Sequence, residues 1–489
     1  MKWQKVARRW LAPIVLGLAL SGVYAVTLAP GLTWANDGAD GGDLIAAAAT
    51  GGVAHPTGYP TFLILARIFL LAPWGSPALR VNLLSALAGM GASMLVADTV
   101  IRAHPGRRAF GLAGGVLGGF ALGVSPLLWS QSVIAEVYSL HTCLAAASLW
   151  SLMIYPMRPL KRMAVWGGIT GFALGNHLTA IFLVPVGLGA AWLSGRFMRW
   201  RALATAVVSV TTCALGLYAL LPWWASRRPA INWGNAANWD GFIWVVTAEP
   251  YRDLVFQAGP EIWSRVLTSA VWLVEQFGLV GALTGLAGFF LVDLRQPFLR
   301  PGLIGLFGIC ITFAIGYNTA DSYNYLGIAF LAFAVMLGLA LAAGLESAGM
   351  RGRVAGMALT GAVVLLIFSN AIGAMAQADA SQADEAERFG QAVLAGAPEG
   401  AIVVTSQDRD TFTLWYWREA ARQRRDLIVL VKPLLPFAWY REQLQWTYPG
   451  LVIPDEQSVD WIQSLAELNN RPICRTMLDQ AVVLDCSSP

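Results

Sequence analysis

The chain has 489 residues, of which 56% are hydrophobic and only 13% are charged, and its mean hydropathy is +0.57. This composition excludes an ordinary soluble globular protein and is typical of a protein that crosses a membrane many times. The formal net charge is +4, and the basic residues stand in pairs and triplets between apolar runs, which argues against a nucleic-acid partner.

The first apolar run predicts a membrane helix that is retained in the mature protein. Lys2, Lys5, Arg8 and Arg9 precede the run Leu11–Pro30, whose 20 residues are about as many as a helix needs to cross a bilayer. A cleaved signal peptide would begin in the same way, but no small-x-small cleavage site lies near the end of this run.

Ten further apolar runs bring the prediction to about eleven transmembrane helices. They are Ala78–Ile101, Phe110–Trp129, Val133–Tyr155, Met163–His177, Leu178–Ser194, Ala202–Pro222, Phe277–Val292, Pro301–Tyr317, Tyr325–Leu345 and Val354–Met375. The two runs between residues 163 and 194 are short, so we expect them to be tilted or broken. The segment Thr57–Trp74 is also apolar, but it contains Arg67 and has prolines at its edges, so we place it in the membrane interface or as a re-entrant piece.

The charges of the loops predict the orientation. Lys and Arg accumulate in cytoplasmic loops. If Thr57–Trp74 does not cross the membrane, the basic residues between the apolar runs all lie on the same side of the membrane as the N-terminus. These residues are Arg102, Arg107, Arg108, Arg158, Lys161, Arg162, Arg196, Arg199, Arg201, Arg295, Arg300, Arg351 and Arg353. We therefore expect a multi-pass protein of the inner (cytoplasmic) membrane, with a cytoplasmic N-terminus and with loops 31–77 and 223–262 on the exterior face.

The chain changes character near residue 376, where long apolar runs stop and charged residues become frequent. We interpret residues 1–375 as a membrane domain and residues 376–489 as a small periplasmic or exterior α/β domain. In the second domain Ala401–Ser406 and Leu427–Val431 read as buried strands, with Phe412–Arg424 as the helix between them. This order predicts at least one parallel pair of strands.

Two residue pairs in the exterior domain have more than one interpretation. Cys474 and Cys486 can form a disulfide on the exterior side of the membrane, or they can remain as two free thiols. Asp408 and Asp410 precede the predicted helix; they can help the exterior domain to present an acceptor hydroxyl to the acidic loop, or they can cap the N-terminus of the helix, which is the interpretation we favour.

The stretch "DGADGGDLIAAAATGGVAHPTGYP", residues 37–60, follows the first run and is unusually acidic for this chain. It contains Asp37, Asp40, Asp43 and His55. Asp43 alone is suited to complement the N-terminus of the helix that follows it. Three acids beside a membrane, however, need a cation, a metal or a chemical role. They can bind one hard divalent cation, whereas a base that acts on a neutral hydroxyl needs no metal, so both options stay open.

The second predicted exterior loop offers cations and aromatic rings. Arg227, Arg228 and Arg252 are among the few basic residues on the exterior face of the membrane domain. The planar guanidinium group binds phosphate well, so these arginines can hold a phosphate of a substrate or anchor the protein to lipid headgroups. The tryptophans between them can form an aromatic belt or a platform for a sugar ring; they are Trp223, Trp224, Trp233 and Trp239.

Two further exterior turns carry polar groups next to apolar helices. Gln131 and Glu136 lie at the exterior end of one predicted span, and Asn176 and His177 lie at the turn between two spans. A buried glutamate in a membrane helix is unfavourable unless it is paired or functional. A single buried histidine is more often a hydrogen-bonded structural residue, so His177 by itself indicates little.

These loops together predict a transfer reaction at one face of the membrane. A carboxylate can accept the proton of a hydroxyl group as it attacks. Cationic side chains can stabilise a departing phosphate. These are the groups that are needed to move a sugar from a lipid phosphate to a hydroxyl.

Motifs along the whole chain resemble those of a known family. The block "DGGDLIAAAATGGVAHPTGYP" is similar to the "DSGE…LGxAHPPGYPL" signature of the transmembrane protein 260 family, which is grouped with protein O-mannosyltransferases. Further similar motifs are "RVNLLSAL" at 80–87, "WSQSVIAEVYSLH" at 129–141, "ALGNHLT" at 173–179, "RPAINWG" at 228–234 and "SQDRDTFTLWYWREAARQRRDLIVLV" at 406–431.

The resemblance implies a polytopic GT-C-like fold and an inverting enzyme that uses a polyprenyl-phosphate-linked sugar, mannose by the family name. It implies a catalytic acid in the first exterior loop, where Asp40 and Asp43 match the two acids of the signature. Gly41 replaces a serine, and Asp43 is one methylene shorter than the glutamate, so we expect Asp40 to be the base. The motifs and the loop cations give the substrate-binding candidates, which are His55, Tyr59, Glu136, Tyr138, Asn176, His177, Arg227, Arg228, Asn232, Trp233 and Arg252.

Two other functions compete with the transferase. A transporter or flippase of lipid-linked sugars would also need a polar cavity, but transporters usually carry charges at the midplane and inverted repeats, and neither is evident here. A noncatalytic scaffold would bind a partner through the exterior domain. For the transferase, the expected partners are the polyprenyl-phosphate sugar, the lipid bilayer and a protein or glycan acceptor.

Overall fold

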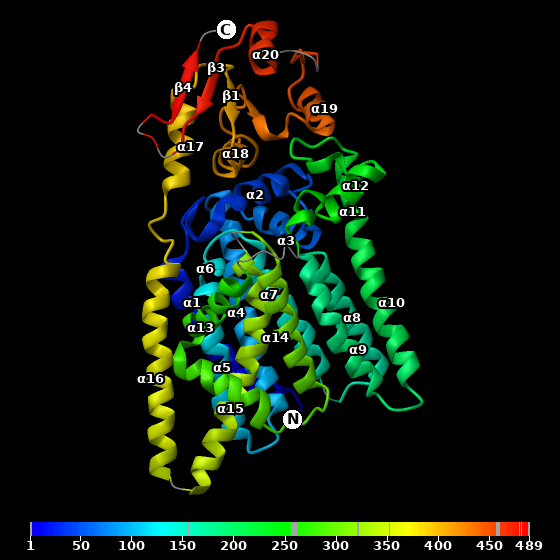
Figure 1. The fold of residues 1–489 in the computed structure, drawn as a ribbon, viewed down its shortest axis with the longest axis vertical. Coiled ribbons are helices and arrows are strands. Elements are labelled where there is room, and N and C mark those ends of the chain that lie inside the picture. Colours follow the sequence, from blue (N-terminus) through cyan, green and yellow to red (C-terminus); the bar gives the residue numbers. More distant parts are fainter. Residues whose placement is uncertain are drawn as a thin grey trace.

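The computed structural model describes residues 2–154, 156–255, 262–319, 322–351, 353–455, 460–478, 480 and 482–487. Of the predicted exterior loop 223–262, residues 256–261 lie outside the described part of the chain. The fold is an elongated helical bundle with a small sheet domain at one end (Figure 1).

Each of the predicted apolar runs coincides with a helix. The helices are α1 (Lys2–Thr27), α4 (Pro77–Ala103), α5 (Arg108–Gly123) with α6 (Pro126–Ser132), α7 (Val137–Leu152), α8 (Pro159–Leu174), η2 (Leu178–Leu183) with α9 (Val184–Trp192), α10 (Arg199–Tyr218), α13 (Ile262–Leu291), α14 (Leu299–Gly316), α15 (Gly327–Arg351) and α16 (Arg353–Ala378).

Eleven helices were predicted to cross the membrane, but fewer are long enough to do so as single straight helices. Within the described residues, six helices are long and apolar enough to cross a membrane, and a seventh is added if α5 and α6, which are bent by 64°, form one broken span. Helices α7 and α8 have 16 residues each, or about 24 Å at 1.5 Å per residue, against a hydrocarbon thickness of about 30 Å.

Small residues allow the central helices to approach closely. Helix α15 is the most buried candidate span, with 83% of its apolar window inside the molecule, and it packs against α5. Gly114 and Gly118 of α5 face Gly338 of α15, and a Cβ atom on Gly114 would lie 2.2 Å from the carbonyl oxygen of Gly338. Contacts of this kind hold helices together in a bilayer, where apolar side chains gain nothing from leaving lipid.

The segment between α1 and α4 forms two short helices, α2 (Gly41–Thr50) and α3 (Pro60–Leu70). With 11 residues, α3 is too short to cross a membrane, as predicted for Thr57–Trp74. Arg67 on α3 donates to the carbonyl of Gly52 at 3.0 Å, and its guanidinium lies 3.7 Å above the ring of Trp224.

The C-terminal domain contains a four-stranded sheet in the order β2-β1-β3-β4. Strands β1 (Ile402–Thr405) and β2 (Ile428–Val431) are parallel, and β3 (Ile473–Thr476) is parallel to β1. Strand β4 (Leu484–Ser487) is antiparallel to β3. Helix α18 (Asp408–Trp415) and the short helix η6 (Tyr416–Ala420) connect β1 to β2, so the predicted strand-helix-strand unit with a parallel pair is confirmed.

Further helices complete this domain and the loops of the membrane bundle. They are η1 (Ala35–Asp40), α11 (Leu220–Ala225), η3 (Trp233–Asn235), α12 (Trp239–Val246), η4 (Glu249–Leu254), η5 (Ser322–Leu326), α17 (Glu385–Gly396), η7 (Lys432–Leu434), α19 (Ala438–Thr447) and α20 (Trp461–Asn469). Cys474 and Cys486 face each other across β3 and β4 and form a disulfide, which decides between the two interpretations of this pair.

The elements with predicted exterior loops gather at one end of the bundle. Figure 1 shows α2, α3, α11 and α12 at the end that carries the sheet domain, whereas the N-terminus, the α9–α10 connection and the C-terminal end of α15 lie toward the opposite end. The two ends therefore separate the acidic loop from the basic loops, as the topology predicts. Which end faces the cytoplasm stays a prediction.

The sheet domain docks on the acidic loop through direct backbone contact. Helix α2 packs against α18 and η6, and a Cβ atom on Gly42 would lie 2.3 Å from the carbonyl oxygen of Phe412. Only glycine permits this approach. Trp34 donates to the hydroxyl of Thr413 at 3.1 Å, and Trp446 donates to the carbonyl of Pro229 at 3.1 Å.

Candidate active site

A cavity of about 740 Å³ lies where the first loop, the second loop and α18 meet. Seven of the candidate residues line it: Asp40, His55, Tyr59, Tyr138, His177, Trp233 and Arg252. The remaining candidates, Asp43, Glu136, Asn176, Arg227, Arg228 and Asn232, do not line it. Segments more than 350 residues apart in the chain therefore contribute to one site.

Asp40 presents its carboxylate to the cavity. It ends η1 and occupies the N-cap position of α2, but its side chain makes no capping hydrogen bond to that helix. Asn36 and Asp37, on the same short helix, adopt left-handed backbone conformations with φ of 58° and 61°, and Asp37 also lines the cavity. The side chain of Asp40 is 39% exposed, so a substrate hydroxyl can reach it.

Asp43 is fully buried and holds the neighbouring groups in place. Its Oδ2 accepts the backbone N–H of His55 at 3.0 Å and lies 2.7 Å from His55 Nδ1. Its Oδ1 accepts the indole N–H of Trp233 at 3.0 Å. Asp43 does lie in the first turn of α2, as its cap interpretation expects, but these hydrogen bonds show that its carboxylate orients His55 and Trp233.

His55 bridges the two carboxylates. Its Nε2 lies 3.5 Å from Asp40 Oδ2 on the side opposite Asp43. Burial lowers the pKa of His55, but the charge of Asp40, the hydrogen bond and charge of Asp43, and the charge of Glu136 together raise this pKa to about 9. The imidazole is therefore protonated at neutral pH and places a positive charge beside Asp40.

Aromatic rings form much of the cavity wall. Phe412 stacks on the imidazole of His55 with 6.2 Å between ring centroids, and Trp233 packs edge-on against Phe412 at 6.2 Å. Farther inside, Tyr325 lies 5.9 Å from Tyr138 and 5.2 Å from the ring of His177. Such rings can pack against the apolar faces of a sugar or against an isoprenoid chain.

The three candidate arginines of the second loop differ in position. Arg252, on η4, lines the cavity and is held by the hydroxyl and the carbonyl of Thr247. Arg227 is exposed and lies 3.8 Å above the ring of Trp223, and Arg228 is exposed with a left-handed backbone. Only Arg252 is therefore placed to meet an anion inside this cavity.

The other candidates support the loops that surround the cavity. Glu136 is buried and caps α7 by accepting the N–H of Val137 at 3.1 Å. Asn176 donates to the carbonyl of Val137 at 3.1 Å. Asn232 pairs with Val53 as parallel backbone, which joins the first loop to the second.

The C-terminal domain contributes a carboxylate and a ring that sequence reasoning did not assign to the site. Asp408 and Phe412 of α18 line the cavity. Burial and the charges of Asp43 and Asp410 raise the pKa of Asp408, against the opposing charge of His55. Asp410 caps α18 in a capping box with Gln407, so the cap interpretation is confirmed for Asp410.

The acids of the first loop do not converge on one point. Within the described residues, no group of three or more His, Cys, Asp or Glu side chains is placed to hold a metal ion. Asp43 is directed to His55 and Trp233, whereas Asp37 and Asp40 line the cavity. Asp40 therefore presents its carboxylate to the cavity beside the imidazole of His55.

Comparisons with known proteins find similarity to one group of membrane proteins. Residues 40–200 match the model of the protein O-mannosyl-transferase TMEM260 N-terminal domain, and residues 386–457 match TMEM260-associated domain 2. The chain is 25% identical to protein O-mannosyl-transferase TMEM260 of Mus musculus over 93% of its length. It is 24% identical to protein O-mannosyl-transferase tmem260 of Dictyostelium discoideum over 94% of its length. The chain spans about two thirds of these relatives, 67% and 63% respectively.

Solved structures share the fold at low sequence identity. ArnT from Cupriavidus metallidurans bound to undecaprenyl phosphate superposes with a TM-score of 0.63 at 13% identity, covering 95% of this chain and 93% of that one. The Archaeoglobus fulgidus oligosaccharyltransferase gives a TM-score of 0.55 at 13% identity, covering 95% and 68%. The chain therefore resembles the TMEM260 proteins in both of its domains and has the fold of the GT-C glycosyltransferases.

Proposed function

We propose that this protein is an inverting glycosyltransferase that moves a sugar from a polyprenyl-phosphate donor to a hydroxyl acceptor, with Asp40 as the base. The observation that carries the proposal is the half-exposed carboxylate of Asp40 next to His55 in a cavity of about 740 Å³. The family match and the names of the two relatives support a glycosyl transfer.

In the proposed reaction the acceptor oxygen attacks the anomeric carbon from the face opposite the phosphate. The bond from the anomeric carbon to the phosphate oxygen breaks, and the polyprenyl phosphate leaves with the electron pair. Asp40 takes the proton of the acceptor hydroxyl. Arg252 and protonated His55 offset the negative charge on the departing phosphate.

The lining of the cavity favours a lipid-linked donor. Beyond the charged end, its wall includes the apolar side chains of Ile181, Phe182, Ile309 and Phe313. An isoprenoid chain can lie against such a wall while its phosphate remains near Arg252. The ArnT structure that shares this fold was solved with undecaprenyl phosphate bound, which supports this class of donor.

The names of the relatives and the disulfide support the proposed acceptor and the proposed side of the membrane. The relatives are named as protein O-mannosyl-transferases, which supports mannose and a protein Ser or Thr hydroxyl. The disulfide between Cys474 and Cys486 suits an oxidising compartment, and the arginines at the other end suit the cytoplasm. We therefore place the site on the exterior face.

The test compares Asp40→Asn with Asp240→Asn in membranes supplied with a polyprenyl-phosphate sugar. Asp240 is exposed in the first turn of α12 and is not among the residues that line the cavity, so its variant controls for the loss of one carboxylate. Transfer by correctly inserted Asp40→Asn at the rate of the control would overturn the proposal. Sugar that crosses sealed vesicles without chemical change would favour a transporter instead.

We further propose that transfer needs no divalent cation, because a carboxylate base acts directly on a neutral hydroxyl. Purified enzyme treated with a chelator and then gel-filtered is expected to keep its activity. A loss of activity that added Mg²⁺ or Mn²⁺ restores would show that a cation takes part.

A further inference from the structure

A second cavity, of about 780 Å³, lies at the end of the bundle away from the sheet domain. Five segments build it: the C-terminal end of α4, the start of α5, the end of α7 with the start of α8, the end of α9, and the connection between α13 and α14. Its volume is within the range of small-molecule sites. None of the residues assigned to the proposed transfer reaction lines it.

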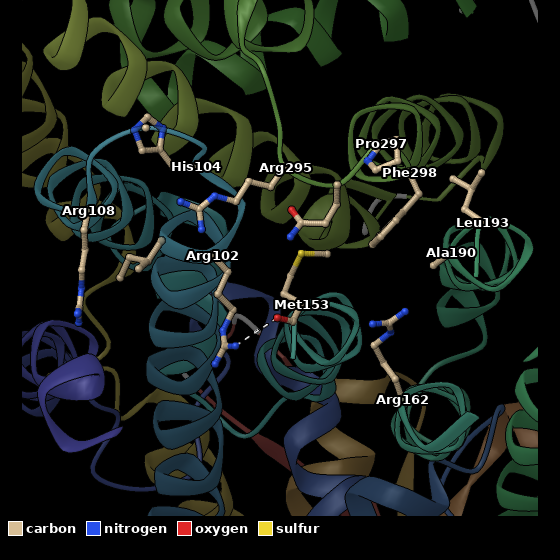
Figure 2. A pocket seen from close by; sticks show the side chains of 13 residues that line it. Arg102, His104, Arg108, Met153, Arg162, Ala190, Leu193, Arg295, Pro297 and Phe298 are labelled. Carbon is tan, nitrogen blue, oxygen red and sulfur yellow. Dashed lines mark hydrogen bonds between the residues drawn. The ribbon is translucent and has the colours of Figure 1, made fainter. Parts of the chain in front are cut away.

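This basic cavity is lined by Arg102, His104, Arg108, Arg162 and Arg295, and no acidic residue belongs to its described lining. Figure 2 shows Arg102, Arg162 and Arg295 around Met153, with Arg108 farther out. The four arginines come from α4, α5, α8 and the α13–α14 connection, so it is the packing of the bundle that brings them together.

Two of the basic side chains lie close to acidic residues. Arg102 forms an ion pair with Asp98 at 2.5 Å, and His104 Nε2 lies 3.1 Å from Glu346. Both acids lie outside the lining. Arg108 and Arg295 therefore contribute strongly to the positive field inside the cavity.

Buried polar groups also face this cavity. Gln296 is 8% exposed and His104 is 3% exposed, and both belong to the lining. Gln296 Oε1 and His104 Nδ1 have no hydrogen-bond partner among the described residues. Buried polar atoms without a partner are unfavourable, and a ligand with several oxygen atoms can satisfy them, since the amide of Gln296 can present either its oxygen or its NH2 group.

The accumulation of basic residues on one side of a membrane does not by itself explain the arrangement. Lys161 is adjacent to Arg162 in the chain but is exposed, whereas Arg162 is 7% exposed. Arg196 lies on the neighbouring α9–α10 connection, Arg199 and Arg201 lie in the first turn of α10, and none of the three lines the cavity. A topological signal needs only charge in the loops, and it does not explain why arginines from four separate segments line one cavity.

We propose that this basic cavity binds a phosphate-bearing anion, as the headgroup of an anionic phospholipid or as a free phosphate compound. Guanidinium groups bind phosphate oxygens in a planar fork, and basic pockets between membrane helices bind anionic headgroups. Leu193 and Phe298 form an apolar part of the lining, against which acyl chains can pack.

The test measures binding to the full-length protein in mild detergent by native mass spectrometry. The probes are phosphatidylglycerol, phosphatidylcholine, and glycerol phosphate as the soluble source. Retention of phosphatidylglycerol over phosphatidylcholine, without competition by glycerol phosphate, supports the lipid. Binding of glycerol phosphate at a comparable concentration, with displacement of the lipid, supports a free phosphate compound. The proposal is wrong if the protein retains phosphatidylglycerol no better than phosphatidylcholine and does not bind glycerol phosphate.

The variants locate the binding. Arg108 and Arg295 are exposed, so the double variant Arg108→Gln with Arg295→Gln should fold. Each arginine should contribute about fivefold to the affinity for phosphatidylglycerol, so the double variant should bind this lipid roughly 25-fold more weakly. Lys161→Gln with Arg201→Gln removes the same charge outside the cavity and should change binding less than about threefold. Equal losses in the two double variants would mean that only surface charge attracts the lipid, which overturns the proposal. Arg162→Gln is a third variant, but the decision does not depend on it.

Discussion

The two cavities of this protein lie at opposite ends of one bundle and differ in chemistry. The cavity beneath the sheet domain joins carboxylates, a protonated imidazole, one arginine and several aromatic rings. The basic cavity has four arginines and no acid in its described lining. The two cavities thus have similar volumes, but one has groups suited to proton transfer and the other has groups suited to binding an anion.

The largest expected effect is that of Asp40→Asn, which should slow sugar transfer at one cavity without changing anion binding at the other. Asp40→Asn removes the proposed base, and general-base catalysis contributes about 100- to 10,000-fold. The rate of sugar transfer should therefore fall by that factor, while the retention of phosphatidylglycerol at the basic cavity stays within about twofold. Transfer rates and native mass spectra on one preparation check both parts, and a fall in both would show that the two ends are not independent.

The pH dependence of stability should report on His55. Its pKa rises from 6.5 to about 9 in the folded protein. This contribution to the free energy of unfolding is fully present below pH 6.5 and is lost as the pH rises through 9, on the order of 3 kcal/mol in all. Thermal unfolding between pH 6 and pH 10 should show the loss.

Asp43→Asn should weaken that pH dependence, because the variant removes the charge that lies 2.7 Å from His55 Nδ1. The matched control is Asp240→Asn, which changes an exposed carboxylate. An unfolding profile of Asp43→Asn with the same pH dependence as the control would contradict the assignment of this ion pair.

Gly42→Ala should disturb only the end with the sheet domain. Its Cβ atom would lie 2.3 Å from the carbonyl oxygen of Phe412, so α18 must shift, at a cost of about 1 to 3 kcal/mol in stability. Transfer should fall with Phe412 displaced, whereas anion binding should remain. Gly22→Ala on α1 meets nothing within 4 Å and serves as the control in thermal unfolding and in transfer assays.

The smallest expected effect distinguishes the arginines of the second loop. Arg252→Gln removes a cation that lines the cavity and should raise KM for the lipid-linked donor about tenfold, since a charge-assisted hydrogen bond contributes about 1.5 to 3 kcal/mol. Arg227→Gln should change KM less than about twofold, because Arg227 is exposed above Trp223. Equal effects of the two variants would place the donor phosphate outside the cavity.

Local patterns predicted the helices and the sheet because they depend on short-range composition. The apolar runs each coincide with a helix, and the parallel pair β1–β2 follows from two short β-branched runs on either side of a helix. The lengths were less predictable. The run Val133–Tyr155 predicted a longer helix than α7, which covers only Val137–Leu152 because Glu136 caps it at its N-terminus.

The site was predictable where one loop carries it and unpredictable where the domains meet. Asp40, Asp43 and His55 stand within 16 residues, so the acidic block indicated them. Asp408 and Asp410 read alike in the sequence, yet one lines the cavity and the other caps α18. That difference arises from how α18 docks on α2, which no local pattern records.

The contribution of α18 has a consequence for biosynthesis. Asp408 and Phe412 close the cavity from a segment that the ribosome makes after all the helices of the bundle. The helices of the bundle can thus be inserted into the membrane and packed while the cavity still lacks the residues that α18 contributes to its lining. Activity is then acquired in a final step, when the newly folded sheet settles onto the helices beneath it.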